Sequence, residues 1–135
     1  MKLEQLQEEL ANDLVLDQTK LQYEAANNPI LYSKWATKRS NIRKEMLRIE
    51  SKKKVAHKRK LDYYSGRGDE VSMDRYERSE MKVVIMGDQE MIKLETSYEY
   101  WGILLEFCTS AMDAVKSRGF AIKNIIELRQ YEGGK

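Results

Sequence analysis

The stretch NPILYSKWATKRSNIRKEMLRIESKKKVAHKRK, residues 28–60, decides the fold of this 135-residue chain. Asn28 is a good helix N-cap, and Pro29 suits the first helical position, where its missing N–H costs no hydrogen bond. The apolar residues that follow lie within a sector of about 60° when the chain is projected as a helix. They are Leu31, Trp35, Ile42, Met46 and Ile49. The pattern predicts a long helix that starts at Asn28, turns this stripe toward a core and ends near Tyr64.

The apolar stripe disappears after Ile49. From Lys52 to Lys60, lysine and arginine occupy every side of the helix, so we expect no face of this segment to pack on an apolar core. Residues 34–60 hold twelve lysines and arginines against two acidic residues, a net charge of +10, whereas the segments before and after them each carry −4. Charge segregation on this scale indicates a polyanionic partner or neutralisation within the protein.

Amphipathic helices are also predicted before and after the long helix, so the expected fold class is all-α. Residues 1–16 have leucines at helical spacing, and a second short helix is expected from about residue 17 to 26. The glycine at position 119 is expected to separate two further helices, residues 89–118 and residues 120–131.

The region between the long helix and position 88 has two possible assignments. Ser72 is a candidate N-cap for a helix, and the pair Gly87-Asp88 indicates a helix stop followed by a new N-cap. The residues expected to face inward in such a helix are Met73, Tyr76 and Val83 or Val84. Residues 83–86 could instead form a short strand, although no second convincing strand exists to pair with it.

Two apolar faces run along the predicted helix 89–118. One face carries Trp101, Leu105, Cys108, Met112 and Val115, and the other carries Leu104, Phe107, Ala111 and Ala114. One short chain can scarcely bury both faces, so we expect residues 87–135 to join subunits into a homo-oligomer, with residues 1–86 forming an N-terminal region that contains the basic segment 34–64. The residues expected to make subunit contacts are Trp101, Leu104, Leu105, Cys108, Met112, Val115, Phe120 and Ile125.

Nucleic acid is the expected partner of the basic segment, because cations around a helix pair well with phosphates and poorly with a protein interior. Tyr63 and Tyr64 add aromatic rings on which the bases of a single strand could stack. The candidate DNA-binding residues are Lys52, Lys53, Lys54, Lys58, Arg59, Lys60, Tyr63 and Tyr64. Two alternatives to nucleic acid stay open: a solvated or internally neutralised surface, and an anionic lipid surface. The missing apolar face beyond Ile49 argues against insertion into lipid.

Nothing in the sequence predicts an enzyme, a metal site or a cofactor. Cys108 and His57 are the only residues of their kinds, which excludes a disulfide within the chain and leaves too few ligands for zinc. The glycines around Arg67 lack the Gly-Lys-Ser/Thr sequence of a phosphate-binding loop. The acidic residues near that loop fit no ordered metal-ligand spacing; they are Asp62, Asp69, Glu70 and Asp74. The N-terminus does not resemble a signal peptide, and the longest apolar run, residues 100–105, is too short for a membrane span.

Eight strings spread over nearly the whole chain point to a known family. They are LQEEL (6–10), TKLQYEAANN (19–28), LYSKW (31–35), EMLRIE (45–50), LDYYSGRGD (61–69), SMDRYE (72–77), YWGILL (100–105) and KSRGFAIK (116–123). On these strings the sequence resembles the UvsY family of recombination mediators from T-even-type bacteriophages. The resemblance implies a protein that binds single-stranded DNA, weakens the hold of the phage single-stranded-DNA-binding protein and promotes loading of the recombinase filament. It implies no catalytic step.

The resemblance also implies particular residues and an assembly. The family's DNA-contacting basic pair falls on Lys58 and Lys60; the second position is arginine in the family pattern, so Lys60 keeps the charge but lacks the planar fork. The loop after residue 69 is slightly shorter than in that pattern. The implied assembly is a ring-like homo-oligomer, a hexamer or heptamer, closed through the C-terminal region and acting in the cytoplasm of the infected bacterial host. The alternative is a helical assembly protein whose basic segment is neutralised by neighbouring subunits and binds no DNA.

Overall fold

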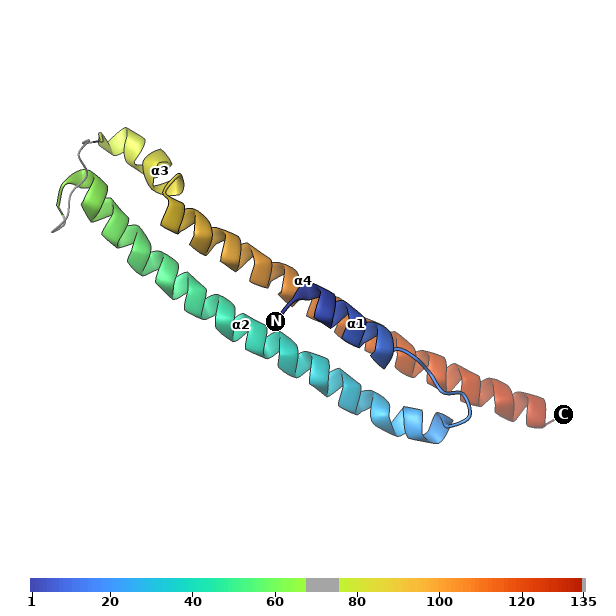
Figure 1. The fold of residues 1–135 in the computed structure, drawn as a ribbon. Helices are drawn as coiled ribbons and strands as arrows, with labels where there is room; N and C mark the ends of the chain where they lie inside the picture. The colour runs from blue at the N-terminus through green and yellow to red at the C-terminus, as the bar shows by residue number, and fades with distance from the viewer. Residues whose placement is uncertain (68–75, 135) are drawn as a thin grey trace. The chain divides into compact units, whose positions relative to one another are not determined.

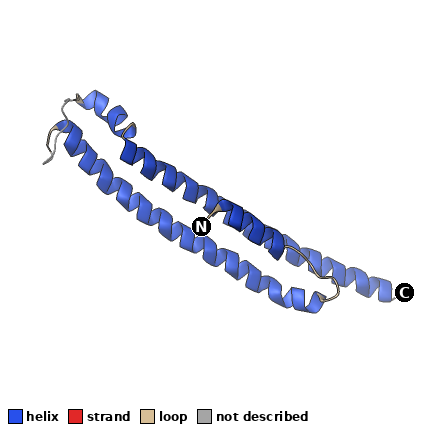
Figure 2. Cartoon of the chain, in the orientation of Figure 1, coloured by secondary structure: helices blue, strands red, loops and turns tan. Residues whose placement is uncertain are grey.

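Every regular element that the structure describes is a helix. The computed structural model describes residues 1–67 and 76–134, and Figure 2 shows helices and loops but no strand in these ranges. In chain order (Figure 1) the elements are α1 (Leu3–Asp13), α2 (Leu21–Ser65), α3 (Arg78–Met86) and α4 (Gln89–Gly133). The all-α prediction is confirmed, and α3 excludes the alternative strand over residues 83–86.

The turn between α3 and α4 ends one helix and caps the next. Gly87 is the C-cap of α3. The Oδ1 atom of Asp88 then accepts hydrogen bonds from the backbone N–H groups of Glu90 (2.9 Å) and Met91 (3.3 Å). These bonds satisfy two of the N–H groups that the first turn of α4 leaves without a helical partner. The predicted stop and N-cap are confirmed.

Helix α2 passes through Pro29, so the predicted helix start at Asn28 is wrong. The helix begins at Leu21 and includes the proline in its interior, where the missing N–H and the crowding ring cost about 3 kcal/mol. Asn28 makes a bond across to α4 instead of capping a helix, because its Nδ2 donates to the backbone carbonyl of Val115 at 2.9 Å. The other end of α2, at Ser65, agrees with the prediction.

Helix α4 continues past Gly119, so the predicted division into helices 89–118 and 120–131 is also wrong. A Cβ atom added at position 119 would lie 2.9 Å from the Nδ2 atom of Asn28. Glycine inside a helix costs about 1 kcal/mol relative to alanine, and here it allows the two helices to approach closely. The residue that suggested a helix stop therefore marks a contact between helices.

The described chain divides into two compact units. The first contains residues 1–42 and 103–135, and the second contains residues 43–102. Each unit combines segments from both regions that the sequence suggested, 1–86 and 87–135, because in each unit a part of α2 packs with a part of α4.

The core of the first unit lies between α1, α2 and α4. Trp35 and Ile42 of α2 are fully buried, so the predicted apolar stripe does face a core. The Nε1–H group of Trp35 donates to Oδ2 of Asp13 in α1 at 2.9 Å, which gives the buried indole its polar partner. The buried residues that α4 contributes to this core are Leu104, Cys108, Ala111, Val115 and Ile122.

A buried ion pair joins α4 to the start of α2 in the same unit. Arg118 is only 7% exposed, and its Nη2 donates to Oε2 of Glu24 at 2.7 Å and to the carbonyl of Val15 at 2.8 Å. Its Nη1 donates to Oδ1 of Asn28 at 2.9 Å. A buried charge is tolerated only when it is paired and hydrogen-bonded, so this network fixes the three segments together.

The second unit packs α3 against parts of α2 and α4 around a smaller core. Its buried apolar residues are Ile49, Ala56, Met81 and Ile85. In α3, Met81 and Ile85 face inward and Val83 is 72% exposed, so of the two alternatives at positions 83 and 84 Val83 is not the inward-facing one. The half-buried residues near this helix are Tyr76 and Val84. The predicted cap Ser72 and the predicted inner residue Met73 lie outside the described residues.

Candidate nucleic-acid interface

Part of the basic segment faces the interior of the second unit. Ala56 is 3% exposed, and the side chains of Lys53 and Lys60, which lie one turn before and after it, are only 23% and 22% exposed. The prediction that no face packs beyond Ile49 is therefore wrong. Lysine can occupy such a face because its methylene stem covers apolar surface while its ammonium group reaches a polar partner.

Two acids neutralise the cations at the C-terminal end of this segment. One lies in the turn before α4 and the other in the first turn of α4. The Nζ atom of Lys60 lies 3.3 Å from Oδ2 of Asp88 and 3.3 Å from Oε2 of Glu90. Arg59 also pairs with Glu90, through its Nη2 atom. The hydrogen bond from Arg59 is the main cause that holds the pKa of Glu90 below its usual value. Both cations are therefore engaged with acids of their own chain.

Asp88 also receives a hydrogen bond from Tyr64, whose hydroxyl donates to Oδ2 at 2.7 Å. Partial burial acts to raise the pKa of Asp88, but the hydrogen bonds from Tyr64, the Met91 amide and Lys60 outweigh it and hold that pKa below its usual value. Donation to Asp88 in turn raises the pKa of Tyr64 to about 12. At neutral pH the carboxylate is charged and the tyrosine keeps its proton.

Lys53 is neutralised in the same manner, by a different acid of α4. Its Nζ atom pairs with Glu95 and lies 4.7 Å from the centre of the Tyr98 ring. A cation at this distance from an aromatic face is attracted by the ring quadrupole. Lys53 therefore contributes to the contact between α2 and α4 within the unit.

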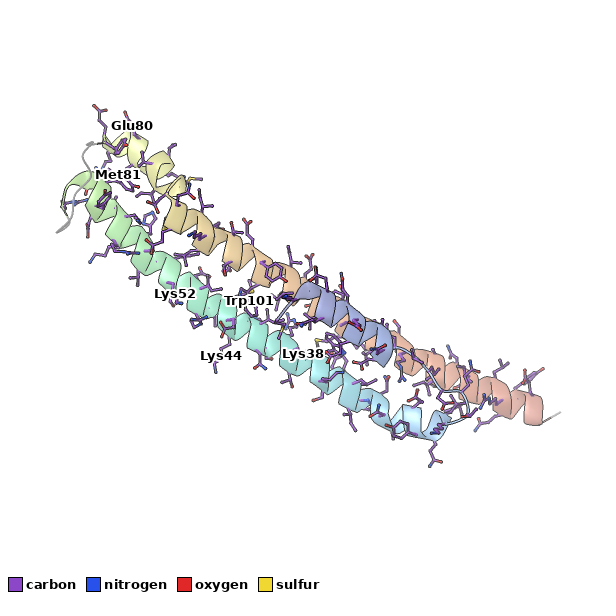
Figure 3. The ribbon with its side chains drawn as sticks, in the orientation of Figure 1. Lys38, Lys44, Lys52, Glu80, Met81 and Trp101 are labelled. Atoms are coloured by element: carbon purple, nitrogen blue, oxygen red, sulfur yellow. The ribbon has the colours of Figure 1, made fainter. Side chains whose placement is uncertain are left out.

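Three lysines of the same segment point outward. Lys52, Lys54 and Lys58 are exposed, and none of them makes an ion pair with any described residue. Lys54 and Lys58 are four residues apart, so they are neighbours on one side of α2, about 6 Å apart along its axis. Lys44 is exposed as well, and Figure 3 shows it projecting from α2 on the side away from α4. We call Lys52, Lys54 and Lys58 the outward lysines.

The two candidate tyrosines have packing partners inside the second unit. The ring centres of Tyr63 and Tyr64 are 4.9 Å apart in an edge-to-face arrangement, and Tyr64 meets Tyr76 edge-to-face at 5.8 Å. Tyr64 also holds Asp88 through its hydroxyl. Both rings therefore pack at the end of α2.

The beginning of the basic segment is neutralised within the first unit. Lys34 pairs with Asp13 and lies 3.9 Å from Glu9, and Lys38 lies 3.0 Å from Glu9. These acids belong to α1. Internal neutralisation of the basic charge thus applies to Lys34 and Lys38 but not to the outward lysines.

The residues expected to join subunits have unequal exposure. Leu104, Cys108 and Val115 are fully buried, so the structure places them in the core of a single chain. Phe120 is 67% exposed. The candidates that are half-buried are Trp101, Leu105, Met112 and Ile125. Only exposed residues are available to a second copy of the chain, and Phe120 is the most exposed of the predicted subunit contacts.

The described residues offer few groups for other chemistry. No group of three or more histidine, cysteine, aspartate or glutamate side chains in residues 1–67 and 76–134 is placed to hold a metal ion. Burial raises the pKa of the Cys108 thiol, which disfavours the reactive thiolate. The acidic residues Asp69, Glu70 and Asp74 lie outside the described ranges.

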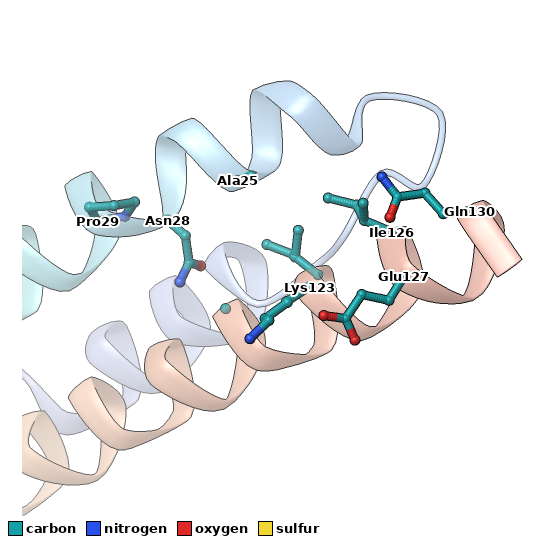
Figure 4. Close-up of a pocket in the computed structure, with 9 residues that line it drawn as sticks. Ala25, Asn28, Pro29, Lys123, Ile126, Glu127 and Gln130 are labelled. Atoms are coloured by element: carbon teal, nitrogen blue, oxygen red, sulfur yellow. The ribbon is translucent and has the colours of Figure 1, made fainter.

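Two further features bear on possible partners. A hollow of about 500 Å³ lies beside Pro29 in the first unit, and its lining includes both Lys123 and Glu127, which Figure 4 labels, so its charge is mixed. Among the helices of the described ranges, none contains an apolar run that could cross a bilayer.

The fold and the outward lysines together define an all-helical protein with a set of exposed cations on α2. A family model described as "Recombination, repair and ssDNA binding protein UvsY" matches residues 9–135, and the chain belongs to this family. The chain is 65% identical to "Recombination protein uvsY" of Enterobacteria phage T4 over the full length of both proteins. The resemblance inferred from the sequence is confirmed, and an assembly protein without DNA binding is not favoured.

Solved structures agree with this assignment. The chain is 64% identical to the bacteriophage T4 recombination mediator protein UvsY in one crystal lattice, with a TM-score of 0.91 and 98% of each chain covered. In a second lattice of the same protein the identity is 65%, the TM-score is 0.89, and 95% of this chain and 98% of the other are covered. The helical fold is therefore shared with a crystallographically known recombination mediator.

Proposed function

We propose that this chain is a recombination mediator that holds the phosphates of single-stranded DNA on its outward lysines. Binding the strand weakens the resident single-stranded-DNA-binding protein and promotes loading of the recombinase filament. The proposed activity consists of binding alone, with no catalytic step and no cofactor. The T4 relative comes from a phage, and we place the action of this chain in the cytoplasm of the infected bacterium.

The observation that carries the proposal is the division of one basic segment into paired and outward cations. Lys53, Arg59 and Lys60 are engaged with acids of α4 and of the turn before it. Lys52, Lys54 and Lys58 project from the same rigid helix without an acidic partner among the described residues. Phosphates can bind the outward lysines without breaking an ion pair, so these residues are the DNA contacts. Lys60 then supports the site by fixing α4 against α2.

The proposal includes a ring-like homo-oligomer of six or seven subunits. A row of exposed and half-buried residues on α4 in the first unit recurs every three, four or seven residues, as helices in a coiled-coil seam require; it consists of Ile103, Phe107, Ala114, Ala121, Ile125 and Leu128. Ile103 is 48% exposed and Leu128 is 56% exposed, so a second copy of the chain would bury apolar surface there. Several subunits would present their outward lysines together and raise the effective concentration of binding sites on one strand.

The oligomer can be tested by charging the middle of this row. Ala114→Glu places a carboxylate among apolar neighbours, and we expect the mass measured by analytical ultracentrifugation to fall below that of the wild-type assembly. Lys116→Glu changes the charge on a different side of α4 and should keep the wild-type mass. An Ala114→Glu protein with unchanged mass would show that the subunits meet elsewhere.

The DNA contact is tested by fluorescence anisotropy across a salt series. For the wild type, the logarithm of the binding constant should fall with the logarithm of salt by about 0.7 for each phosphate contacted on a single strand. The triple variant Lys52→Ala, Lys54→Ala, Lys58→Ala should bind more weakly and with a slope flatter by about 2. Duplex DNA serves as the comparison ligand.

The matched control is Lys93→Ala, which removes an exposed lysine of α4 in the same unit. It should leave both affinity and slope near the wild-type values. Equal slopes in the triple variant and the wild type, with helix content and oligomer mass preserved, would contradict the proposal. The phage recombinase and the phage single-stranded-DNA-binding protein are the proposed protein partners, and they would dock away from the outward lysines.

A further inference from the structure

A pocket of about 530 Å³ lies between the end of α2 and α3 in the second unit. Its floor is apolar and is formed by Leu61 of α2 with Met81 and Ile85 of α3. Figure 3 places Met81 near the C-terminal end of α2. Tyr76 adds an aromatic ring to the wall. The volume is in the range of pockets that enclose small organic ligands.

The rim of this pocket is basic. Arg67, Arg78 and Lys82 line it, and no described lining residue is acidic. None of these three cations makes an ion pair with a described residue; the Nε atom of Arg67 donates to the hydroxyl oxygen of Ser65 at 3.1 Å. An apolar floor and an aromatic wall below a basic rim suit a ligand that has a flat ring and a phosphate.

The pocket adjoins the outward lysines on α2. The lining residue His57 lies three residues after Lys54, and Leu61 lies three residues after Lys58. Residues three apart on a helix are neighbours on its surface. A strand whose phosphates follow Lys54 and Lys58 would therefore pass the mouth of the pocket.

We propose that the pocket takes one unstacked base of the bound single strand, while Arg78 and Lys82 contact the phosphates beside it. This assignment rests on the proposed single-strand binding and adds a base contact to the phosphate contacts of the outward lysines. A single strand has no base pair to break, so turning one base outward loses only stacking. Stacking on an aromatic ring accepts every base, so the pocket would bind without reading sequence.

The test compares an ordinary oligonucleotide with an abasic one of the same length and charge. The wild-type protein should bind the ordinary strand at least about fivefold more tightly, which is the low end of the contribution of one stacked base. Ser65→Trp fills the pocket without changing the charge, and it should bring the ratio of the two dissociation constants close to one. Its salt slope on the ordinary strand should stay at the wild-type value.

The matched control is Ser79→Trp, which makes the same substitution at an exposed position of α3 outside the pocket lining and should keep the wild-type ratio. A ratio that is equal in wild type and Ser65→Trp would overturn the pocket assignment, and an unchanged salt slope would leave the proposed DNA binding standing. If Ser65→Trp abolished binding of an aspartate-rich peptide and kept the ratio, the pocket would belong to a protein partner.

A second measurement uses the unmodified protein and does not depend on how Ser65→Trp folds. A single strand that contains photoreactive 4-thiothymidine is irradiated in complex with the wild-type chain, and the crosslinked peptides are identified by mass spectrometry. Adducts on Tyr76 or Met81 would place a base in the pocket. Adducts confined to peptides outside the pocket would overturn the assignment.

Discussion

Gly119 of α4 lies against Asn28 of α2 so closely that a Cβ atom at position 119 would stand 2.9 Å from Nδ2 of the asparagine. The asparagine cannot easily turn away. Its Nδ2 donates to the carbonyl of Val115, and its Oδ1 accepts from Arg118. Two positions that look like helix boundaries in the sequence are therefore the two sides of one contact between helices.

Gly119→Ala tests this contact. Alanine inside a helix gains about 1 kcal/mol over glycine, but the new methyl group must displace Asn28 and break its hydrogen bonds, at a cost of about 1–3 kcal/mol for each buried group left unpaired. We expect a net loss of about 1 kcal/mol in the free energy of unfolding, measured by urea denaturation followed by circular dichroism.

Gly102→Ala is the matched control, because the nearest atom to an added Cβ there is Cε of Met46 at 3.8 Å, an ordinary contact. This variant should be more stable than the wild type by about 0.5–1 kcal/mol. In an Asn28→Ala background the penalty at position 119 should disappear. Two glycine variants that change stability by the same amount would contradict the idea that Asn28 restricts position 119.

The same contact explains which parts of the fold could be predicted from the sequence. The apolar stripe through Trp35 and Ile42 and the cap at Asp88 follow from local rules of helix periodicity and capping, and the structure agrees with both. Proline and glycine are helix breakers in those rules. At Pro29 and Gly119, packing between helices outweighs local preference, and a single sequence does not reveal which contacts a helix will make.

The candidate site could also be predicted only in part from the sequence. Counting charges identified the basic segment, but a projection of polar and apolar residues could not separate Lys58, which faces solvent, from Lys60, which faces Asp88. The distinction depends on where α4 supplies acids. The basic pocket also went unpredicted, because its lining comes from α2 and α3 together with Arg67 and Tyr76.

Pro29→Ala should stabilise the protein. The substitution restores a backbone N–H inside α2 and removes the ring that crowds the preceding turn, so we expect the free energy of unfolding to rise by about 1–3 kcal/mol. Thermal denaturation followed by circular dichroism measures the change. Ser33→Ala, one turn later at an exposed position, is the control and should shift stability by less than about 0.5 kcal/mol. A destabilised Pro29→Ala protein would mean that α2 needs the proline.

Lowering the pH should destabilise the second unit because it protonates Asp88. Its pKa in the folded protein is below the ordinary value of 3.8, so its contribution to stability is fully present above that value and is lost as the pH falls through the folded pKa. Asp88→Asn keeps a good N-cap but cannot titrate. We expect the stability of this variant, measured by urea denaturation, to fall less steeply than that of the wild type below about pH 4. Parallel acid profiles would show that Asp88 is not a titrating contributor.

Raising the pH should also destabilise the protein, in this case through ionisation of Tyr64. Its pKa is raised from 10.0 to about 12, so its contribution to stability is present below the ordinary value and is lost as the pH rises through the folded pKa. An ultraviolet absorbance titration should show one of the eight tyrosines ionising near pH 12. This late component should be missing from Tyr64→Phe and present in Tyr23→Phe, which removes an exposed ring.

Lys58 and Lys60 should have different effects when each is replaced by alanine. Lys58→Ala removes an outward cation, so single-strand affinity should fall and the salt slope should flatten by about 0.7, with stability changed by less than about 0.5 kcal/mol. Lys60→Ala removes a cation that lies 3.3 Å from both Asp88 and Glu90. We expect it to lower the free energy of unfolding by about 1 kcal/mol and to change the salt slope less than Lys58→Ala does.

Lys60→Arg separates the two roles of position 60, because it keeps the charge and restores the residue of the family pattern. It should recover the stability that Lys60→Ala loses while leaving the salt slope near the wild-type value. Anisotropy and urea denaturation on the same protein preparations give both quantities. A Lys60→Ala protein with unchanged stability and a salt slope as flat as that of Lys58→Ala would contradict this assignment. Lys60 would then leave Asp88 and Glu90 to bind phosphate in the complex, and its ion pairs would contribute nothing to the fold.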